Sequence, residues 1–408
     1  MSGSRVVLVT LLALALGACS GPERNPVPID QMSIATIPNL PDVRYWGDTP
    51  PENLDDLGVE LEAQRRASGI GKEPIFLAIS GGGDSGAFGA GLLKAWSDLG
   101  TRPEFAVVTG VSTGALTAPF AFLGPDYDDQ LAELYGGGHP PSAYFKKRSI
   151  FSIWPNASVA DSAPLFELIK KYGTADMLAK IAREHKRGRR LLVQSANMDA
   201  QRAVIWDLGA IAVSGAPNAL DIFQKALLAS ASVPGVFPPV VFDVEVDGQQ
   251  YQELHADGGV ISQDTTLGDW QYNIRKSREA RAGSQRISAI YLIRNGRVEP
   301  EPEITEFNIL GLSGRAVSTL IKMQGIGDIV TAYGSAVISG ADFRVTWIGR
   351  DFEAPYPGPF DPGYMKALYQ YGYDLMMAGE AWENKPLMLM SDEERRRSPR
   401  MGAPAPAS

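Results

Sequence analysis

Residues 104–124 read EFAVVTGVSTGALTAPFAFLG, in which two apolar runs flank a serine set between glycines. The run FAVVTG (105–110) suits a short buried strand, and TGALTAPFAFLG (113–124) suits a helix. Ser112 therefore falls on a strand-to-helix turn, with Gly110 and Gly114 on either side. Glycines in the pattern G-x-S-x-G relieve crowding there and let the hydroxyl project from the carboxyl edge of a sheet. The stretch predicts an α/β fold with Ser112 as a candidate nucleophile.

A second strand–turn–helix unit precedes this one. IFLAIS (75–80) predicts a buried strand, GGGDSG (81–86) a turn, and AFGAGLLKAWSDLG (87–100) a helix. Two such units within 50 residues imply a right-handed crossover and a parallel sheet. We expect one α/β domain over residues 71–390. Its further elements are a strand pair (189–199 and 201–209), a helix (218–233), a hairpin (240–259), a strand (287–295), a helix (about 315–338), a strand (343–349) and a helix (364–382).

The glycine-rich turn after the first strand has two interpretations. Gly81, Gly83 and Gly86 have the spacing of a dinucleotide-binding loop, which requires an acidic residue near the end of the next strand. That strand ends without a carboxylate, and Glu104 precedes it. The alternative is an oxyanion hole, because consecutive glycines expose backbone N–H groups to a developing negative charge. We favour the oxyanion hole, formed by Gly81, Gly82 and Gly83.

A nucleophilic serine needs a base, and the chain has three histidines. His139 and His185 lie in segments typical of surface loops and charged helices. His255 and Asp257 stand in LHADGG, where they point to the same side of a strand. Gly258 and Gly259, which follow, allow the backbone to approach a neighbouring loop closely. The residues alone leave Asp257 and His255 both open as the base.

Four blocks of the sequence together resemble the patatin-like phospholipase family, and the resemblance covers about residues 74–265. In that family a serine and an aspartate form a dyad within a three-layer α/β sandwich that has a central, mainly parallel sheet. The resemblance implies that Ser112 is the nucleophile, Asp257 the base, and Gly81, Gly82 and Gly83 the oxyanion loop. One departure is Ser85, where the family commonly has a basic residue, so the resemblance leaves recognition of a phosphate head group open. The blocks are GGGDSG (81–86), GVSTG (110–114), ASVPGVFPPV (231–240) and DGG (257–259).

Both ends of the chain differ in composition from the middle. Residues 1–18 predict a lipoprotein signal peptide, because Arg5 precedes an apolar core that is too short to span a bilayer. Leu16-Gly17-Ala18-Cys19 resembles a bacterial lipobox, which implies that Cys19, the only cysteine, is lipidated. With Ser20 after it, this predicts an outer-membrane anchor. We expect residues 19–70 to form a tether and residues 391–408 a disordered tail.

Charge and composition limit the partners. The net charge of −9 argues against nucleic acid, and the dispersed histidines predict no metal site and no cofactor. The expected function is therefore a lipid-anchored serine acyl hydrolase that cleaves phospholipids, lysophospholipids or other acyl esters. A generic esterase without lipid preference is one alternative. A catalytically inactive scaffold that binds lipid or a protein partner is the other.

Overall fold

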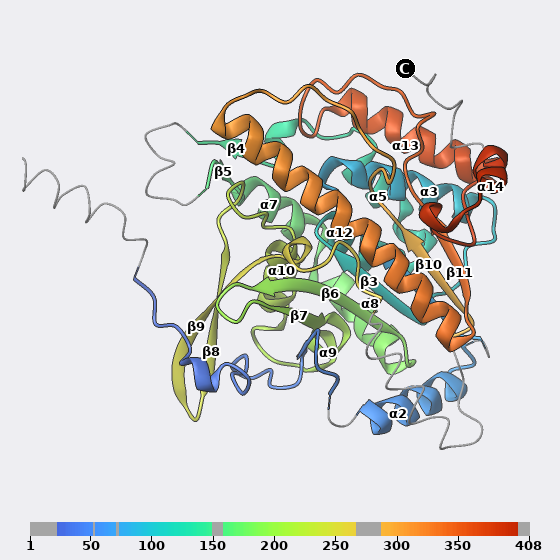
Figure 1. The fold of residues 1–408 in the computed structure, drawn as a ribbon. Coiled ribbons are helices and arrows are strands. Elements are labelled where there is room, and N and C mark those ends of the chain that lie inside the picture. Colours follow the sequence, from blue (N-terminus) through green and yellow to red (C-terminus); the bar gives the residue numbers. More distant parts are fainter. Residues whose placement is uncertain (1–22, 52–53, 71–72, 149–157, 267–286, 399–408) are drawn as a thin grey trace, which may run out of the picture.

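The computed structural model describes residues 23–51, 54–70, 73–148, 158–266 and 287–398. Among these residues the central feature is a nine-stranded, mainly parallel sheet with the order β1-β7-β6-β3-β2-β10-β11, and β9 and β8 join it through β6 (Figure 1). A two-stranded sheet, β4–β5, lies apart from it. The strands are β1 (Arg44–Trp46), β2 (Ile75–Ile79), β3 (Val107–Val111), β4 (Lys146–Lys147), β5 (Ala160–Asp161), β6 (Arg190–Asn197), β7 (Arg202–Asp207), β8 (Val240–Val246), β9 (Gln249–Asp257), β10 (Ala289–Ile293) and β11 (Asp342–Thr346).

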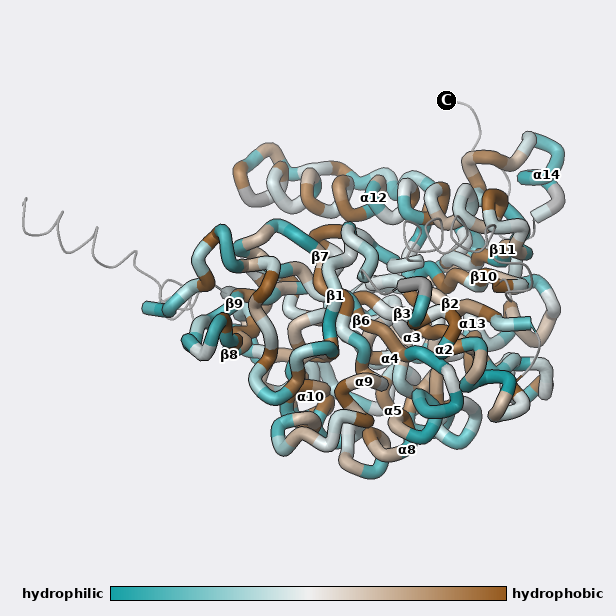
Figure 2. The backbone as a smooth tube through the Cα atoms, turned by 90° about the horizontal axis from the view of Figure 1, so that it is seen from below, coloured by the Kyte–Doolittle hydropathy of each residue, from teal (hydrophilic) through white to brown (hydrophobic). Residues whose placement is uncertain are grey.

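Helices cover both faces of this sheet, so the chain forms three layers. Figure 2 shows α12 on one side of the strands, with α3, α4, α8 and α10 on the other. Alternating side chains of β2 divide between the two cores: Leu77 and Ile79 face the larger helical layer, whereas Phe76 and Ala78 face α12. The helices are α2 (Leu54–Ala67), α3 (Gly86–Asp98), α4 (Thr113–Leu123), α5 (Asp128–Tyr135), α7 (Ala163–Tyr172), α8 (Ala175–Lys186), α9 (Leu208–Val213), α10 (Ala219–Ser230), α12 (Ile309–Ser339), α13 (Pro362–Met377) and α14 (Asp392–Arg397).

Strands β3 and β9 meet end to end on one edge of β6. The parallel strand β3 pairs with the first part of β6, up to Val111 opposite Gln194. The antiparallel strand β9 pairs with the remainder, beginning with Asp257 opposite Ser195, the next residue of β6. Since the two strands run toward each other, their carboxyl ends adjoin. The residue that follows β3 and the last residue of β9 are therefore brought together.

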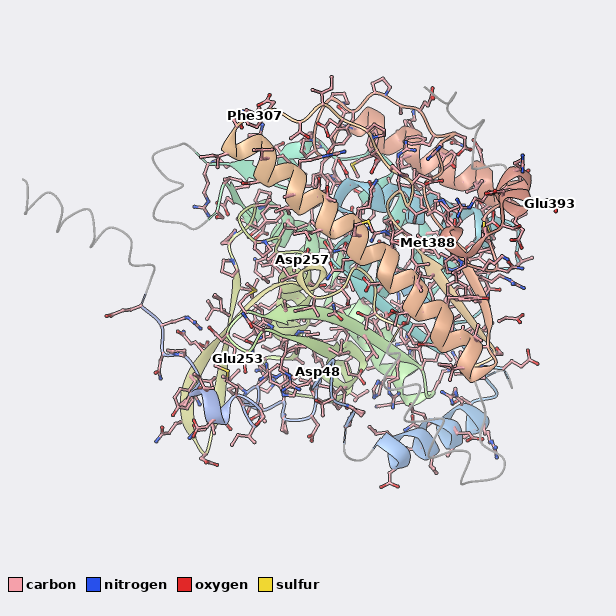
Figure 3. The ribbon with its side chains drawn as sticks, in the orientation of Figure 1. Asp48, Glu253, Asp257, Phe307, Met388 and Glu393 are labelled. Carbon is pink, nitrogen blue, oxygen red and sulfur yellow. The ribbon has the colours of Figure 1, made fainter. Side chains whose placement is uncertain are left out.

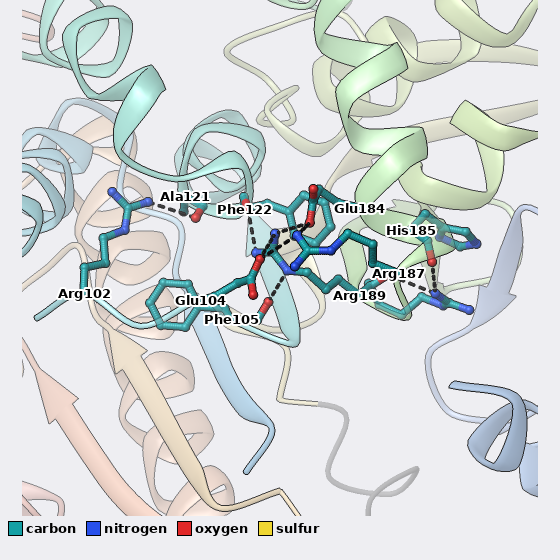
Figure 4. Close-up of polar contacts among 10 residues, drawn as sticks. Arg102, Glu104, Phe105, Ala121, Phe122, Glu184, His185, Arg187 and Arg189 are labelled. Carbon is teal, nitrogen blue, oxygen red and sulfur yellow. Dashed lines mark hydrogen bonds and ion pairs between the residues drawn. The ribbon is translucent and has the colours of Figure 1, made fainter. Parts of the chain in front are cut away.

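The far end of α4 is fixed by two buried arginines. Arg189 donates hydrogen bonds to the carbonyl oxygens of Phe105 and Phe122, and Arg102 donates to that of Ala121 (Figure 4). Cations at a helix C-terminus satisfy its unpaired carbonyls and oppose its negative dipole end. The helix that begins next to Ser112 is therefore held at its opposite end as well.

The expected α/β architecture with a mainly parallel central sheet is confirmed. The predicted strand pair is β6–β7, the predicted hairpin is β8–β9, and the helix expected at about 315–338 is the longer α12. Among the described residues no helix has the length and apolarity needed to cross a membrane. The predicted signal peptide (1–18) and the lipidation site Cys19 lie outside the described residues.

Parts of the predicted tether and tail are ordered against the domain. Within residues 19–70, β1 pairs with β7, and Ile37, Leu40 and Val43 are buried in the main core. These apolar residues are too sparse to show a period, which is why composition alone indicated a tether. Within residues 391–408, Ser391 caps α14, and Glu394 completes a capping box. The described parts of both segments thus depart from the expected tether and tail.

Candidate active site

Ser112 occupies a strained turn between β3 and α4. Its backbone has φ of 54° and ψ of −123°, a combination that side-chain-bearing residues rarely adopt. A Cβ atom on Gly110 would lie 2.3 Å from the carbonyl oxygen of Gly114, and one on Gly114 would lie 2.1 Å from that of Ile79. No larger residue fits at either position without a backbone shift. The two glycines of the motif are therefore explained by packing around the serine.

The backbone of Ser112 is held by a hydrogen-bonded relay to the neighbouring strand. The Ser112 N–H donates to the Ser230 hydroxyl (3.0 Å), and that hydroxyl donates to the carbonyl oxygen of Gln194 on β6 (2.6 Å). Ser230 is fully buried at the end of α10. The relay therefore fixes the strained turn from its β6 side.

Asp257 is the last residue of β9 and is buried beside this turn. Its N–H donates to the carbonyl oxygen of Ser232 (2.9 Å), and its Oδ1 accepts from the N–H of Gly259 (2.7 Å). A Cβ on Gly258 would lie 2.4 Å from the Gln194 carbonyl oxygen, so this position requires glycine. Oδ2 has no hydrogen-bond partner among the described residues. One carboxylate oxygen is thus anchored and the other is left for chemistry.

Burial raises the pKa of Asp257 to about 7, although the Ser112 hydroxyl and the Gly259 N–H both act to lower it. The hydroxyl of Ser112 is thus near enough to interact with the carboxylate. A well-formed hydrogen bond between them is not present, since Oδ2 remains unpaired. Such contacts are often long in a site without substrate and close when substrate binds. A buried carboxylate with one unpaired oxygen beside a serine has the chemistry of a proton acceptor.

The three predicted oxyanion glycines have different environments. A Cβ on Gly81 would lie 3.2 Å from that of Ser112, so the loop packs directly on the serine. The N–H of Gly81, however, donates to the carbonyl oxygen of Gln263 (2.9 Å). The N–H groups of Gly82 and Gly83 have no hydrogen-bond acceptor in the described part of the chain. Of the three predicted oxyanion amides, the Gly81 N–H is therefore already used, and those of Gly82 and Gly83 are available. Gly82 and Gly83 stand at the start of the helical segment that continues into α3.

The remaining motif glycines and Ser85 shape the junction of the two loops. A Cβ on Gly86 would lie 2.4 Å from the Thr113 Oγ1, so the starts of α3 and α4 touch only because this residue is glycine. The neighbouring Asp84 accepts hydrogen bonds from the Phe360 N–H (2.9 Å) and the Tyr356 hydroxyl (3.1 Å). Ser85 thus replaces the family's basic residue beside a buried carboxylate.

Two residues that sequence reasoning missed hold the glycine loop in place. Asn295, just after β10, donates from its side chain to the Ser80 carbonyl oxygen (3.0 Å) and accepts from the Gly89 N–H (3.1 Å). Gln263 donates from its side chain to the carbonyl oxygen of Gly259 (2.8 Å), and its own carbonyl accepts from Gly81. A polar residue directly after a buried strand was a readable signal for Asn295. Gln263 gave no comparable signal, because its role depends on long-range backbone contacts.

His255 is committed to a different network. Its Nε2 is 3.0 Å from Glu253, and its Nδ1 is 2.9 Å from the Ser195 hydroxyl, which in turn accepts from the Trp206 indole (2.8 Å). Arg44 pairs with Glu253. Burial lowers the pKa of His255, which favours the neutral ring. Both ring nitrogens are occupied, so His255 is not placed to deprotonate Ser112.

The other two histidines are also engaged elsewhere. His139 contacts the Tyr172 hydroxyl (3.1 Å), and His185 lies 3.6 Å from Asp207. His185 is more buried than its charged sequence context suggested. Within the described ranges no cluster of three potential metal ligands occurs.

Fold and site define an α/β protein whose serine stands on a strand-to-helix turn beside a buried aspartate. Residues 77–267 match the model of the patatin-like phospholipase family. The chain therefore contains a patatin-like phospholipase domain, which confirms the resemblance seen in the sequence.

Two solved structures also align with the chain. VipD from Legionella pneumophila aligns at 11% identity with a TM-score of 0.38, over 76% of this chain and 67% of that one. The human GIVD cytosolic phospholipase A2 aligns at 10% identity with a TM-score of 0.28, over 68% of this chain. The present chain thus spans about half (51%) of that enzyme's length. Among curated protein sequences no match is found.

Proposed function

We propose that the protein is a serine acyl hydrolase that cleaves the carboxylic ester bonds of lipids through Ser112 and Asp257. The observation that carries the proposal is the meeting of β3 and β9 on one edge of β6, which brings the serine beside a buried, otherwise unpaired carboxylate. A pKa near 7 gives that carboxylate the strength that a general base needs at neutral pH.

The chemistry follows from the roles of these groups. Asp257 takes the proton of the Ser112 hydroxyl while the Ser112 oxygen attacks the ester carbonyl. The N–H groups of Gly82 and Gly83 stabilise the resulting oxyanion. When the carbon–oxygen bond to the alcohol breaks, Asp257 returns the proton to the leaving alkoxide. Water, deprotonated by Asp257, then attacks the acyl-serine. As the bond to the Ser112 oxygen breaks, Asp257 gives this proton to that oxygen, which releases the fatty acid and restores Ser112.

A small apolar cavity lies beside α4, within the helical layer that adjoins the candidate site. Leu116 lies one helical turn after Ser112, and Leu227 lies one turn before Ser230, whose hydroxyl accepts from the Ser112 N–H. Both line a cavity whose walls are almost entirely apolar. Its other lining residues include Phe120, Leu165, Ile169 and Met177.

A fluorophosphonate probe tests the enzymatic proposal directly. We expect the wild-type protein to be labelled, and the Ser112→Ala variant to be unlabelled although it remains folded. Equal labelling of both proteins would contradict the assignment, and absence of labelling in both would favour the inactive scaffold. A series of nitrophenyl esters of increasing chain length, compared with phospholipid vesicles, then separates a lipid hydrolase from a generic esterase.

We further propose that Cys19 carries the lipid anchor and that the protein resides in the outer membrane of a bacterial envelope. The support is the lipobox-like sequence before Cys19, with Ser20 after it. Metabolic labelling with palmitate is expected to mark the wild-type protein and not Cys19→Ser. Fractionation of the envelope tests the location, and recovery of the labelled protein in the inner membrane would contradict it.

A further inference from the structure

The first half of α12 carries most of its large apolar residues on the side that faces away from the protein. Val317 and Ile321, which are also exposed, lie on a neighbouring side. Ile309, Leu312, Leu320 and Met323 recur at helical spacing and so share one face, which we call the α12 apolar face. All four are exposed, with 69% of Leu320 and 58% of Met323 accessible. Phe307, just before the helix, is 97% exposed. Figure 3 places Phe307 at the outer end of α12.

The second half of the same helix shows which side is normally buried. There Gly325, Ile329, Ala332 and Ala336 pack against the sheet and also recur at helical spacing. The α12 apolar face continues instead along Gly327 and Thr331, which are exposed. Its apolar residues are thus turned to the side opposite the core, where an ordinary surface helix has polar residues.

The charged side chains of this half are paired on another side of the helix. Arg315 contacts Glu303 (3.2 Å), and Lys322 donates to the Glu299 carbonyl oxygen (2.8 Å) and pairs with Glu301. Neither cation is therefore directed at the α12 apolar face. A surface of this kind suits the interior of a lipid layer and does not require anionic lipid.

The exposed apolar surface continues to the loops beside the candidate active site. Gln324 donates to the carbonyl oxygen of Ile261 and accepts from the Gln263 side chain (3.2 Å), which joins α12 to the loop after Asp257. In Figure 3 Asp257 lies close to the middle of α12. Further exposed apolar residues flank Asp257 in the adjoining loops, namely Val233, Val236, Val260 and Ile261.

We propose that the α12 apolar face, with these flanking residues, docks the protein on a lipid surface and so presents the Ser112–Asp257 pair to lipid. This inference rests on the proposed function, because it takes lipid to be the substrate. A second copy of the chain on the same surface would cover the loops beside Asp257 with protein. A lipid surface there brings the substrate to these loops.

Binding to phosphatidylcholine vesicles tests the docking surface independently of catalysis. All proteins compared are full-length chains that carry Ser112→Ala, which prevents hydrolysis, and Cys19→Ser, which prevents acylation. Adding Leu312→Ser, Leu320→Ser and Met323→Ser is expected to lower the vesicle partition coefficient about tenfold or more, because these side chains no longer enter the acyl region. The matched control Ile29→Ser/Ile34→Ser changes exposed apolar residues outside α12 and should bind like its parent.

Three outcomes would overturn the docking proposal. The first is unchanged vesicle binding by the triple-serine variant. The second is binding that appears only with phosphatidylglycerol or disappears in 0.5 M NaCl, since it would assign binding to charge. The third is a dimer that the triple substitution converts to a monomer, which would make this face a subunit contact.

Variants that keep Ser112 distinguish failure of the docking proposal from failure of the proposed function. With Ser112 restored, the triple-serine variant should still react with a soluble fluorophosphonate at the parental rate, which also shows that the site is folded. Loss of that labelling in the variant alone would overturn the docking role in favour of a structural one. If the parent is not labelled but the triple variant loses vesicle binding, the proposed function fails and the docking surface stands.

Discussion

The labelling rate of Ser112 should follow the ionisation of Asp257. With a pKa of about 7, the carboxylate is half ionised at pH 7 and mostly protonated well below it, and its protonated form cannot accept the serine proton. The ionised fraction then rises from about 3% at pH 5.5 to about 97% at pH 8.5, a roughly thirtyfold change. The second-order rate of fluorophosphonate labelling of the full chain, measured across this range, should increase by about the same factor with a midpoint near pH 7.

Variants identify the group that titrates. Asp257→Asn should abolish the sigmoidal increase together with most of the labelling. His255→Gln should retain the midpoint, because the His255 ring contacts Ser195 and Glu253 rather than Ser112. A flat profile in the wild-type protein would refute the reasoning, and so would a midpoint that disappears with His255→Gln while the protein stays folded.

Three further predictions concern stability and the support of the site. Because folding raises the pKa of Asp257 above its ordinary value, the native state loses stability as pH rises from about 4 to 7. Asp257→Asn should therefore raise the free energy of unfolding by up to about 4 kcal/mol at pH 8, roughly 2.5 kcal/mol more than at pH 5. Chemical denaturation measures both gains, and equal gains at the two pH values would contradict this. Gln263→Ala removes the hydrogen bond to Gly259 and should lower kcat about tenfold with little change in KM. The control Gln250→Ala changes an exposed glutamine and should leave both constants unchanged. Equal kinetics for the two variants would exclude a positioning role for Gln263. Gly82→Ala would place a Cβ 2.0 Å from the Asn295 carbonyl oxygen and should lower the labelling rate about 100-fold. A folded variant with the wild-type labelling rate would show that Gly82 does not contribute to the oxyanion hole.

The sequence predicts those features of the site that leave a local mark. The glycines beside Ser112 are visible because a strained turn admits no larger residue at those positions. The capping-box pattern that begins at Ser391 is also a local mark, but the composition of the tail led us to expect disorder there. The three-residue strand β1 was not readable, because it depends on pairing with β7 and has no period of its own. The hydrogen bond from the Gly81 N–H to the Gln263 carbonyl oxygen could not be predicted either, because the two residues are distant in the chain.

Two carboxylates on β9 differ in their partners, and this difference supports the proposed role of Asp257 as the base. Glu253 and Asp257 are both buried and lie on the same side of the strand. Burial alone would raise both pKa values, but Arg44 and His255 beside Glu253 lower its pKa to about 2. In the part of the chain that the structure describes, no cation is placed against Asp257, so burial dominates and its pKa rises to about 7. Pairing therefore makes Glu253 a permanent anion that orients His255 within the core. Without such a partner Asp257 can gain and lose a proton near neutral pH, as the proposed transfer to and from Ser112 requires.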